Sequence, residues 1–171
     1  AVISMGDEIA NLSARAFAKK EDGCGFNGDG SATYGGIVGI REKLKNLSGT
    51  IANIAGLQVG SGNAYSELVL ADFRGVVARL PLYADPNAAW YCSKSFYWNV
   101  MVAALYAAGG TTTTELEQAR NQLFLGYPVR FSQVMPKTEA NSQVCAVFGD
   151  IAMGATLGDR RQYSIAMSEH A

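Results

Sequence analysis

Histidine and cysteine are scarce in this chain. Its 171 residues include one histidine, His170, and three cysteines, Cys24, Cys92 and Cys145. A single histidine cannot form a histidine-rich or Cys₂His₂ metal site, and no two cysteines have Cys-x-x-Cys spacing. Because the cysteines are odd in number and far apart, the sequence predicts free thiols in a reducing compartment rather than a disulfide framework.

Charge is scarce too. Asp, Glu, Lys and Arg make up 17% of the residues, against about 25% in an average soluble domain. The formal net charge is −1 and no stripe of Lys and Arg occurs, which argues against nucleic-acid binding, sequence-specific binding included. A charge-poor surface suits a subunit that is covered by neighbours, and it equally suits a compact domain with modest surface charge.

Long apolar runs are missing. The longest, Val100–Ala108, is far shorter than the roughly 20 residues that span a bilayer. The residues after Ala1 lack the basic stretch followed by an apolar stretch that marks a signal peptide. The sequence therefore predicts neither a membrane span nor a secretion signal.

The glycine-rich motifs fail as nucleotide or metal sites. Gly23–Gly28 has the Gly-x-Gly-x-x-Gly spacing, with Glu42 downstream, but a dinucleotide site needs a strand before the glycines and a helix directly after them. Here a predicted helix precedes and more glycines follow. Gly30–Gly35 has the Walker spacing, but Gly36 occupies the lysine position. Asn27–Gly30 is similar to part of a calcium loop, but the preceding alternate positions have no carboxylates, so a plain turn is predicted.

Catalytic combinations are equally poor. A Ser-His-Asp triad would have to use His170, and no serine lies in a Gly-x-Ser-x-Gly elbow. The paired carboxylates lie near predicted helix ends, where stabilising the helix dipole or simple solvation is their expected role. The sequence therefore predicts that the protein is not an enzyme and uses no cofactor or metal.

Hydrophobic periodicity predicts three helices in the first two thirds of the chain. The first contains Ile9 to Lys20 and stops near Gly23, before a glycine-rich loop that reaches Gly39. The second runs from Tyr65 to Leu80 and is ended by Pro81. The third runs from Ser95, the predicted N-cap, to Ala108, with Gly109 after it. Since this third helix is apolar nearly all round, we expect it to be buried in a core or an interface.

Strands are predicted mainly in the last third. A short strand at 89–92 precedes the third helix, and strands follow at 123–134, 143–148 and 162–168. Thr114 and Glu117 match a capping box, and Gly149-Asp150 interrupts the apolar run that ends at Phe148. Helices interleaved with strands, and strands grouped late, indicate a mixed α+β domain.

Several short motifs occur in one order along almost the whole chain. They are Phe26-Asn27-Gly28-Asp29-Gly30, Gly35-Gly36-Ile37, the helix Ser66–Leu80, Lys94-Ser95, Gly126-Tyr127-Pro128-Val129, Met135-Pro136, Phe148-Gly149-Asp150 and Gly158-Asp159-Arg160-Arg161. In this order they resemble the major capsid proteins of tailed bacteriophages and prophages, whose fold is named after phage HK97.

The resemblance implies a domain organisation. Residues 1–36 correspond to part of the peripheral domain with its spine helix, 37–152 to the axial domain, and 153–171 to an incomplete return to the peripheral domain. The family's N-terminal arm and extended loop would precede Ala1, and a long strand would follow Ala171, so the chain is expected to be a fragment of this fold.

The resemblance also implies a function. The protein would be a structural subunit that assembles into pentamers and hexamers of an icosahedral shell enclosing the genome. Its partners would be copies of itself, with scaffolding or portal proteins as further partners. It would be found in the virion, after assembly in the bacterial cytoplasm. The candidate inter-subunit contacts are Asp29, Asp159, Arg160 and Arg161.

Two alternatives stay open. Encapsulin shells share the same fold, so an encapsulin-like subunit is a near neighbour of the first interpretation. From a different class, the chain could be a small-molecule-binding α+β domain that uses the Gly23–Gly39 loop.

Overall fold

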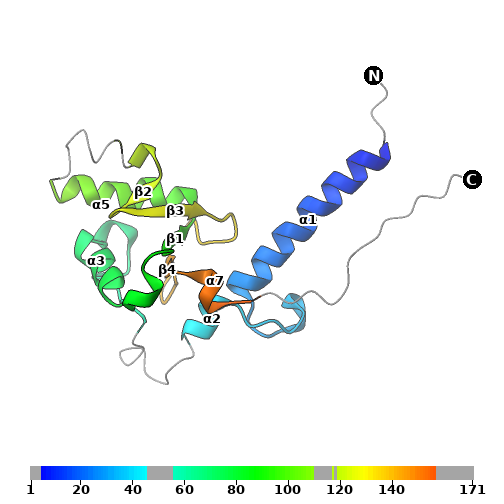
Figure 1. Cartoon of the computed structure of the whole chain (residues 1–171), viewed down its shortest axis with the longest axis horizontal. Coiled ribbons are helices and arrows are strands. Elements are labelled where there is room, and N and C mark those ends of the chain that lie inside the picture. Colours follow the sequence, from blue (N-terminus) through cyan, green and yellow to red (C-terminus); the bar gives the residue numbers. More distant parts are fainter. Residues whose placement is uncertain (1–4, 46–55, 110–116, 118, 157–171) are drawn as a thin grey trace, which may run out of the picture.

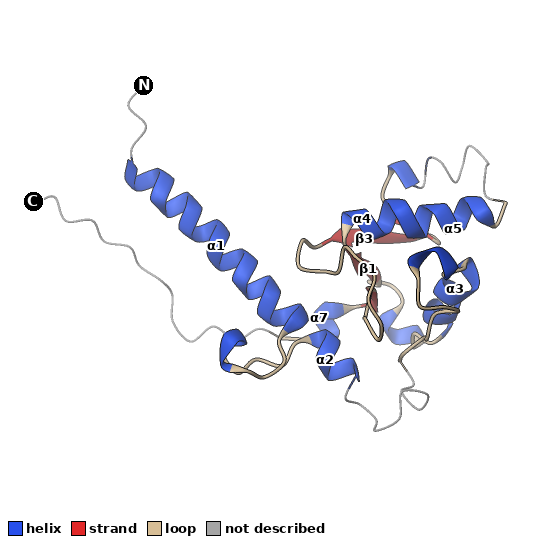
Figure 2. Ribbon diagram, turned by 180° about the vertical axis from the view of Figure 1, so that it is seen from behind, coloured by secondary structure: helices blue, strands red, loops and turns tan. Residues whose placement is uncertain are grey.

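The computed structural model describes residues 5–45, 56–109, 117 and 119–156. A compact body surrounds a small sheet, and one long helix projects from it (Figures 1 and 2). The helices are α1 (Met5–Asn27), α2 (Ile40–Lys45), α3 (Leu70–Ala78), α4 (Lys94–Phe96), α5 (Val102–Ala107) and α7 (Ile151–Gly154). The shorter helical turns are η1 (Ala32–Tyr34), η3 (Tyr65–Glu67), η4 (Leu82–Ala84) and the π-helical η5 (Tyr97–Met101). The strands are β1 (Ala89–Cys92), β2 (Leu123–Phe124), β3 (Tyr127–Phe131) and β4 (Ala146–Gly149).

The sheet confirms the predicted mixed α+β class. Its strand order is β2-β3-β1-β4. Central β1 runs parallel to β3, with Trp90 opposite Val129, and antiparallel to β4, with Trp90 opposite Phe148. Because β1 has a partner on each side, most of its residues are buried. The strand predicted at 89–92 has the bounds that the structure shows.

The prediction of one strand over 123–134 is wrong, because this segment forms a hairpin. β2 and β3 are joined by Leu125 and Gly126, whose φ angles are 51° and 84°. Two successive left-handed residues make the two-residue turn that fits the twist of antiparallel strands. The Tyr127 hydroxyl donates to Asp85 Oδ1 over 2.6 Å and fixes the start of β3 to the segment before β1.

α4, η5 and α5 form one continuous helical segment, here called helix 94–107. Its predicted N-cap, Ser95, is wrong. Ser93 caps it instead: the Ser93 hydroxyl accepts from the Phe96 amide (3.2 Å) and donates to the Pro136 carbonyl (2.7 Å). The predicted stop at Gly109 is confirmed, since helix 94–107 ends at Ala107 and Gly109 has φ 92°.

The expectation that this helix is buried all round is wrong in part. Val100, Met101 and Leu105 are buried, but Trp98 is 44% exposed and Tyr106 is 39% exposed. The sequence does not predict this division, because Trp98 and Tyr106 are aromatic and yet lie on the solvent-facing side of the helix. Trp98 therefore gives the body an uncovered aromatic surface.

The second predicted helix, 65–80, is divided in two. η3 ends at Glu67 and α3 begins at Leu70. The break occurs because Asp72 Oδ2 accepts from the Val69 amide over 3.0 Å and so starts a new helix there. α3 ends at Ala78, shortly before Pro81, as expected for a proline that stops a helix.

The glycine-rich and C-terminal predictions also need correction. α1 continues through Gly23 and Gly25 to Asn27 instead of stopping near Gly23. The strand predicted at 143–148 is limited to β4, Ala146–Gly149, and Gly149 belongs to it. α7 was not predicted; its first turn is capped by Asp150, whose Oδ1 accepts from the Met153 amide. The capping-box residue Thr114 and the strand at 162–168 lie outside the described residues.

An aromatic cluster fills the space between the sheet and the helices. The rings of Phe73, Trp90 and Phe124 meet edge to face, with centroid distances of 5.2 to 6.0 Å. Such edge-to-face pairs add about 0.5–1.5 kcal/mol each beyond the area they bury. These contacts join α3, β1 and β2 into one core, and helix 94–107 completes it through Phe96, Tyr97 and Met101.

The corrected N-cap leads to a stability prediction. Ser93→Ala removes the cap of helix 94–107 and leaves the buried Pro136 carbonyl without its donor, so the free energy of unfolding should fall by about 2–3 kcal/mol. Ser95→Ala, two residues on, is the matched control and should change it by less than about 0.5 kcal/mol. Urea denaturation of both variants measures the difference; equal effects would return the capping role to Ser95.

Candidate assembly surface

α1 leaves most of its length uncovered. Its side chains are exposed over nearly the whole stretch from Met5 to Asp22, and Cys24 is its buried residue. Met5, Ile9 and Leu12 are 78%, 53% and 55% exposed. Their spacing of four and three residues places them on one face of the helix. α1 therefore presents an uncovered apolar stripe, defined here as Met5, Ile9 and Leu12, on a helix that extends away from the body (Figure 1).

The C-terminal end of α1 is fastened to the body by Asn27. Its side-chain amide donates to the Val134 carbonyl over 2.8 Å, and its Oδ1 accepts from the Arg41 guanidinium. Val134 belongs to the segment after β3, and Arg41 belongs to α2. One side chain thus joins three elements and fixes the direction in which α1 leaves the body.

The chain after Asn27 folds back through two closely packed glycines. The Gly39 amide donates to the Gly28 carbonyl over 2.8 Å, and the Gly30 amide donates to the Ile37 carbonyl over 3.0 Å. A Cβ on Gly28 would overlap the Ile37 carbonyl oxygen, and one on Gly39 would lie 2.7 Å from the Gly28 nitrogen. The glycines of this loop are therefore required for backbone-to-backbone packing.

Asp29, one of the predicted inter-subunit contacts, is exposed at the start of this loop. Its Oδ1 accepts from the Ser31 amide over 2.8 Å, and hydrogen bonds from Ser31 hold the pKa of the Asp29 carboxyl below its usual value. Asp29 thus stabilises its own turn, as short acidic side chains commonly do. The other three candidates, Asp159, Arg160 and Arg161, lie outside the described residues.

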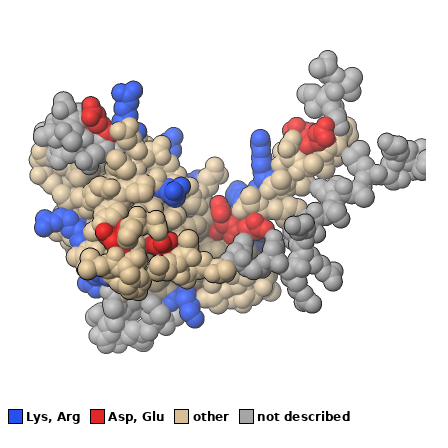
Figure 3. Space-filling model, in the orientation of Figure 1, with Lys and Arg blue, Asp and Glu red and all other residues tan. Residues whose placement is uncertain are grey.

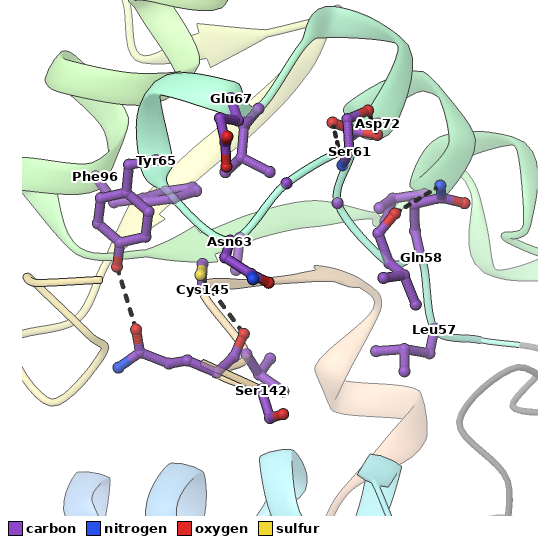
Figure 4. Close-up of a pocket in the computed structure, with 18 of the residues that line it drawn as sticks. Leu57, Gln58, Ser61, Asn63, Tyr65, Glu67, Asp72, Phe96, Ser142 and Cys145 are labelled. Atoms are coloured by element: carbon purple, nitrogen blue, oxygen red, sulfur yellow. Dashed lines mark hydrogen bonds between the residues drawn. The ribbon is translucent and has the colours of Figure 1, made fainter. Parts of the chain in front are cut away.

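A cleft of about 910 Å³ lies between α2, the segment 57–68 with α3, and the segment 140–146. Figure 4 shows Tyr65, Glu67 and Asp72 on one wall and Ser142 and Cys145 on the other. The two carboxylates are engaged in holding the chain: Glu67 Oε2 accepts from the Ala64 amide (2.9 Å), and Asp72 Oδ1 from the Ser61 hydroxyl (2.9 Å). They therefore shape the wall of the cleft.

The thiols of the body are poor nucleophiles. Burial raises the pKa of the Cys145 thiol, and it raises that of Cys92 to about 12. A thiol that stays protonated at neutral pH neither attacks carbonyl carbon nor binds metal readily. Within the described residues, no group of three His, Cys, Asp or Glu side chains could hold a metal ion. No helix in the described part of the chain is long and apolar enough to cross a membrane.

The site geometry is thus a projecting helix with an apolar stripe, fastened to the body by the hydrogen bonds of Asn27. A family model described as the Phage capsid family matches residues 1–171. The chain belongs to the phage capsid family. No curated protein and no solved structure matches it. Proteins of this family are generally structural, and membership makes this capsid chain a structural subunit that self-associates in the shell of a bacteriophage virion.

Sequence reasoning missed Asn27, Ser93 and Trp98 as important residues of this capsid protein. Asn27 lay within a glycine-rich motif that predicts a turn. An amide side chain at the end of a long helix could still have indicated a residue that hydrogen-bonds the helix to the body. Trp98 lay in a run of apolar residues that favours burial. Only the tertiary partners of these side chains distinguish the roles.

The two side-chain hydrogen bonds of Asn27 predict a measurable change in the free energy of unfolding. Asn27→Ala removes the donor to Val134 and leaves the partly buried Arg41 guanidinium without its acceptor, so the free energy of unfolding should fall by about 1–3 kcal/mol. Asn11→Ala, on the exposed part of the same helix, should be neutral or slightly stabilising because alanine favours helix. Chemical denaturation checks both; an unchanged midpoint for Asn27→Ala would show that α1 is held by other contacts.

Proposed function

We propose that this protein is the major capsid subunit of a tailed bacteriophage or prophage, with an HK97-like fold. In this proposal it assembles into pentamers and hexamers, which form an icosahedral shell around the genome. The uncovered apolar stripe of α1 is the observation that carries the proposal. A helix that exposes Met5, Ile9 and Leu12 has no cover within its own described chain and gains stability when a neighbour buries them.

The proposed domain division follows the same lines. Residues 1–36, with α1 as the spine helix, form part of the peripheral domain; 37–152, with the sheet and helix 94–107, form the axial domain; 153–171 return to the peripheral domain. The length of α1 and the hydrogen bonds of Asn27 at its end support a domain boundary close to the glycine loop that follows. Scaffolding and portal proteins are further proposed partners, and assembly takes place in the cytoplasm of the bacterial host.

The two alternatives differ in what the structure offers them. An encapsulin-like shell uses the same assembly surfaces and differs in content. The small-molecule domain was expected to use the Gly23–Gly39 loop, but Gly23 and Gly25 lie in α1, and Gly28 and Gly39 pack against backbone. No described feature of this loop favours a ligand there.

Electron microscopy of the complete gene product tests the proposed function. Expression in bacteria should give closed icosahedral particles or capsomer rings, and their contents separate a phage shell, which holds DNA, from an encapsulin-type shell, which holds protein cargo. A product that sediments as a monomer at all concentrations and forms no rings would contradict the assembly proposal.

The charged segment 158–161 is proposed as an inter-subunit contact together with Asp29. Arginine can bind a neighbour's carboxylate through two parallel hydrogen bonds. Arg160→Glu with Arg161→Glu should change subunit stability by only about 0–1 kcal/mol, because an exposed charge contributes little to folding. Shell yield should fall much more, since every copy would repeat the repulsion. Thermal melting and particle counts on the double mutant measure the two effects; normal yield would show a solvated turn.

A further inference from the structure

A groove of about 700 Å³ lies between the first turns of helix 94–107 and the segment that follows β3. Lys94 and Trp98 line one side, and Phe131 and Lys137 line the other. Both lysines are exposed, and the lining contains no carboxylate. The Trp98 ring, 44% exposed, meets Tyr97 edge to face at 5.3 Å, which orients it. The groove is thus an aromatic surface flanked by positive charge, and it suits an apolar partner that carries a carboxylate.

The first turns of α1 have this chemistry. Met5, Ile9 and Leu12 form the apolar stripe, and at 100° per residue Glu8 lies directly beside it. Asp7, one residue earlier, lies on the opposite side of the helix by the same spacing. Both carboxylates are exposed. The stripe and Glu8 together therefore make an acidic, apolar surface that complements the groove.

The two surfaces cannot meet within one copy. Asn27, at the end of α1, donates to Val134, and Gln133, next to Val134, lines the groove. The end of α1 is therefore rooted beside the groove of its own chain. From Asn27 back to Asp7 a straight helix extends about 30 Å, and Figures 1 and 2 show α1 directed away from the body. Only the α1 of a second copy can present its first turns to the groove.

We propose that the Trp98 groove binds the first turns of α1, Met5–Leu12, from a second copy of this chain, with the apolar stripe on Trp98 and the Glu8 carboxylate between Lys94 and Lys137. This contact deepens the proposed function, because it rests on self-association and names its residues. Its two halves are different surfaces, so each copy gives its helix to the next. Such head-to-tail contacts produce closed rings when the rotation that relates one copy to the next brings the last copy back to the first.

A nucleic acid fits the groove less well. Phosphate binding needs many cations along a face, whereas Figure 3 shows Lys and Arg scattered over the visible face of the body without a continuous band. Two lysines around one aromatic ring match a single carboxylate beside apolar side chains better than a phosphate backbone.

A charge-swap cycle tests the contact. The variants are Glu8→Lys, the pair Lys94→Glu with Lys137→Glu, and all three together. We expect Glu8→Lys and the lysine pair each to weaken self-association of the chain about three- to tenfold, since attraction becomes repulsion. The combined variant should recover most of the loss. Trp98→Ala should weaken association about tenfold or more, as for a central aromatic anchor. Sedimentation equilibrium gives the constants, and particle yield from the complete gene product gives the effect on shells.

Asp7→Lys is the matched control. It makes the same charge change in the same turn and opposes the helix dipole equally, but on the opposite side of α1, so it should leave association unchanged. Circular dichroism of every variant checks that α1 stays helical. Equal losses for Asp7→Lys and Glu8→Lys, or no recovery in the combined variant, would overturn the assignment; in the second case the groove binds another acidic segment.

The outcomes also separate this proposal from the proposed function. If the unmodified gene product forms shells and every variant does so equally well, the groove assignment is wrong and the shell function stands. If the unmodified product never associates, the shell function itself is wrong.

Discussion

Ser93 holds the point at which the central strand becomes a helix. It is the only buried polar or charged side chain in the described part of the chain. Its hydroxyl accepts from the Phe96 amide and donates to the Pro136 carbonyl, so it caps helix 94–107 and anchors the segment after β3 at once. The same segment carries the Val134 carbonyl that Asn27 binds. The direction of α1 therefore depends, through one loop, on the hydrogen bonds of Ser93.

Several carboxylates in the described part of the chain hold local structure. Asp72 starts α3, Asp150 starts α7, Asp29 closes a turn and Asp85 accepts from Tyr127. Carboxylates used in this way satisfy backbone and hydroxyl donors that would otherwise be unpaired. Some exposed positions of α1 and of helix 94–107 are apolar instead, among them Met5, Ile9 and Trp98. A low charge content and exposed apolar side chains are thus two aspects of one design, and both favour contact with other copies of the chain.

The sequence was most informative where local chemistry decides the structure. Gly109 ends its helix and Ala89–Cys92 forms a strand as predicted, because a glycine stop and a short apolar run act within a few residues. It was least informative where a distant group decides. Ser93 and Ser95 are equally good caps by type, and only Pro136, 43 residues from Ser93, selects between them. Leu125 at φ 51° could not be predicted, since leucine is a poor left-handed residue and pairing of β2 with β3 requires it.

The same limit applies to the assembly surface. The spacing of Met5, Ile9 and Leu12 is visible in the sequence, but it is also the spacing of a helix packed on its own core. The structure distinguishes the two because it shows these side chains uncovered. Most helical stability in proteins comes from packing an apolar face rather than from the helix alone. In the described part of the chain, Asn27 fastens the C-terminal end of α1 to the body, and its first turns gain stability from whatever covers the stripe. A neighbour that binds those turns stabilises the helix by mass action, which couples the order of α1 to the concentration of subunits and makes its ordering part of assembly.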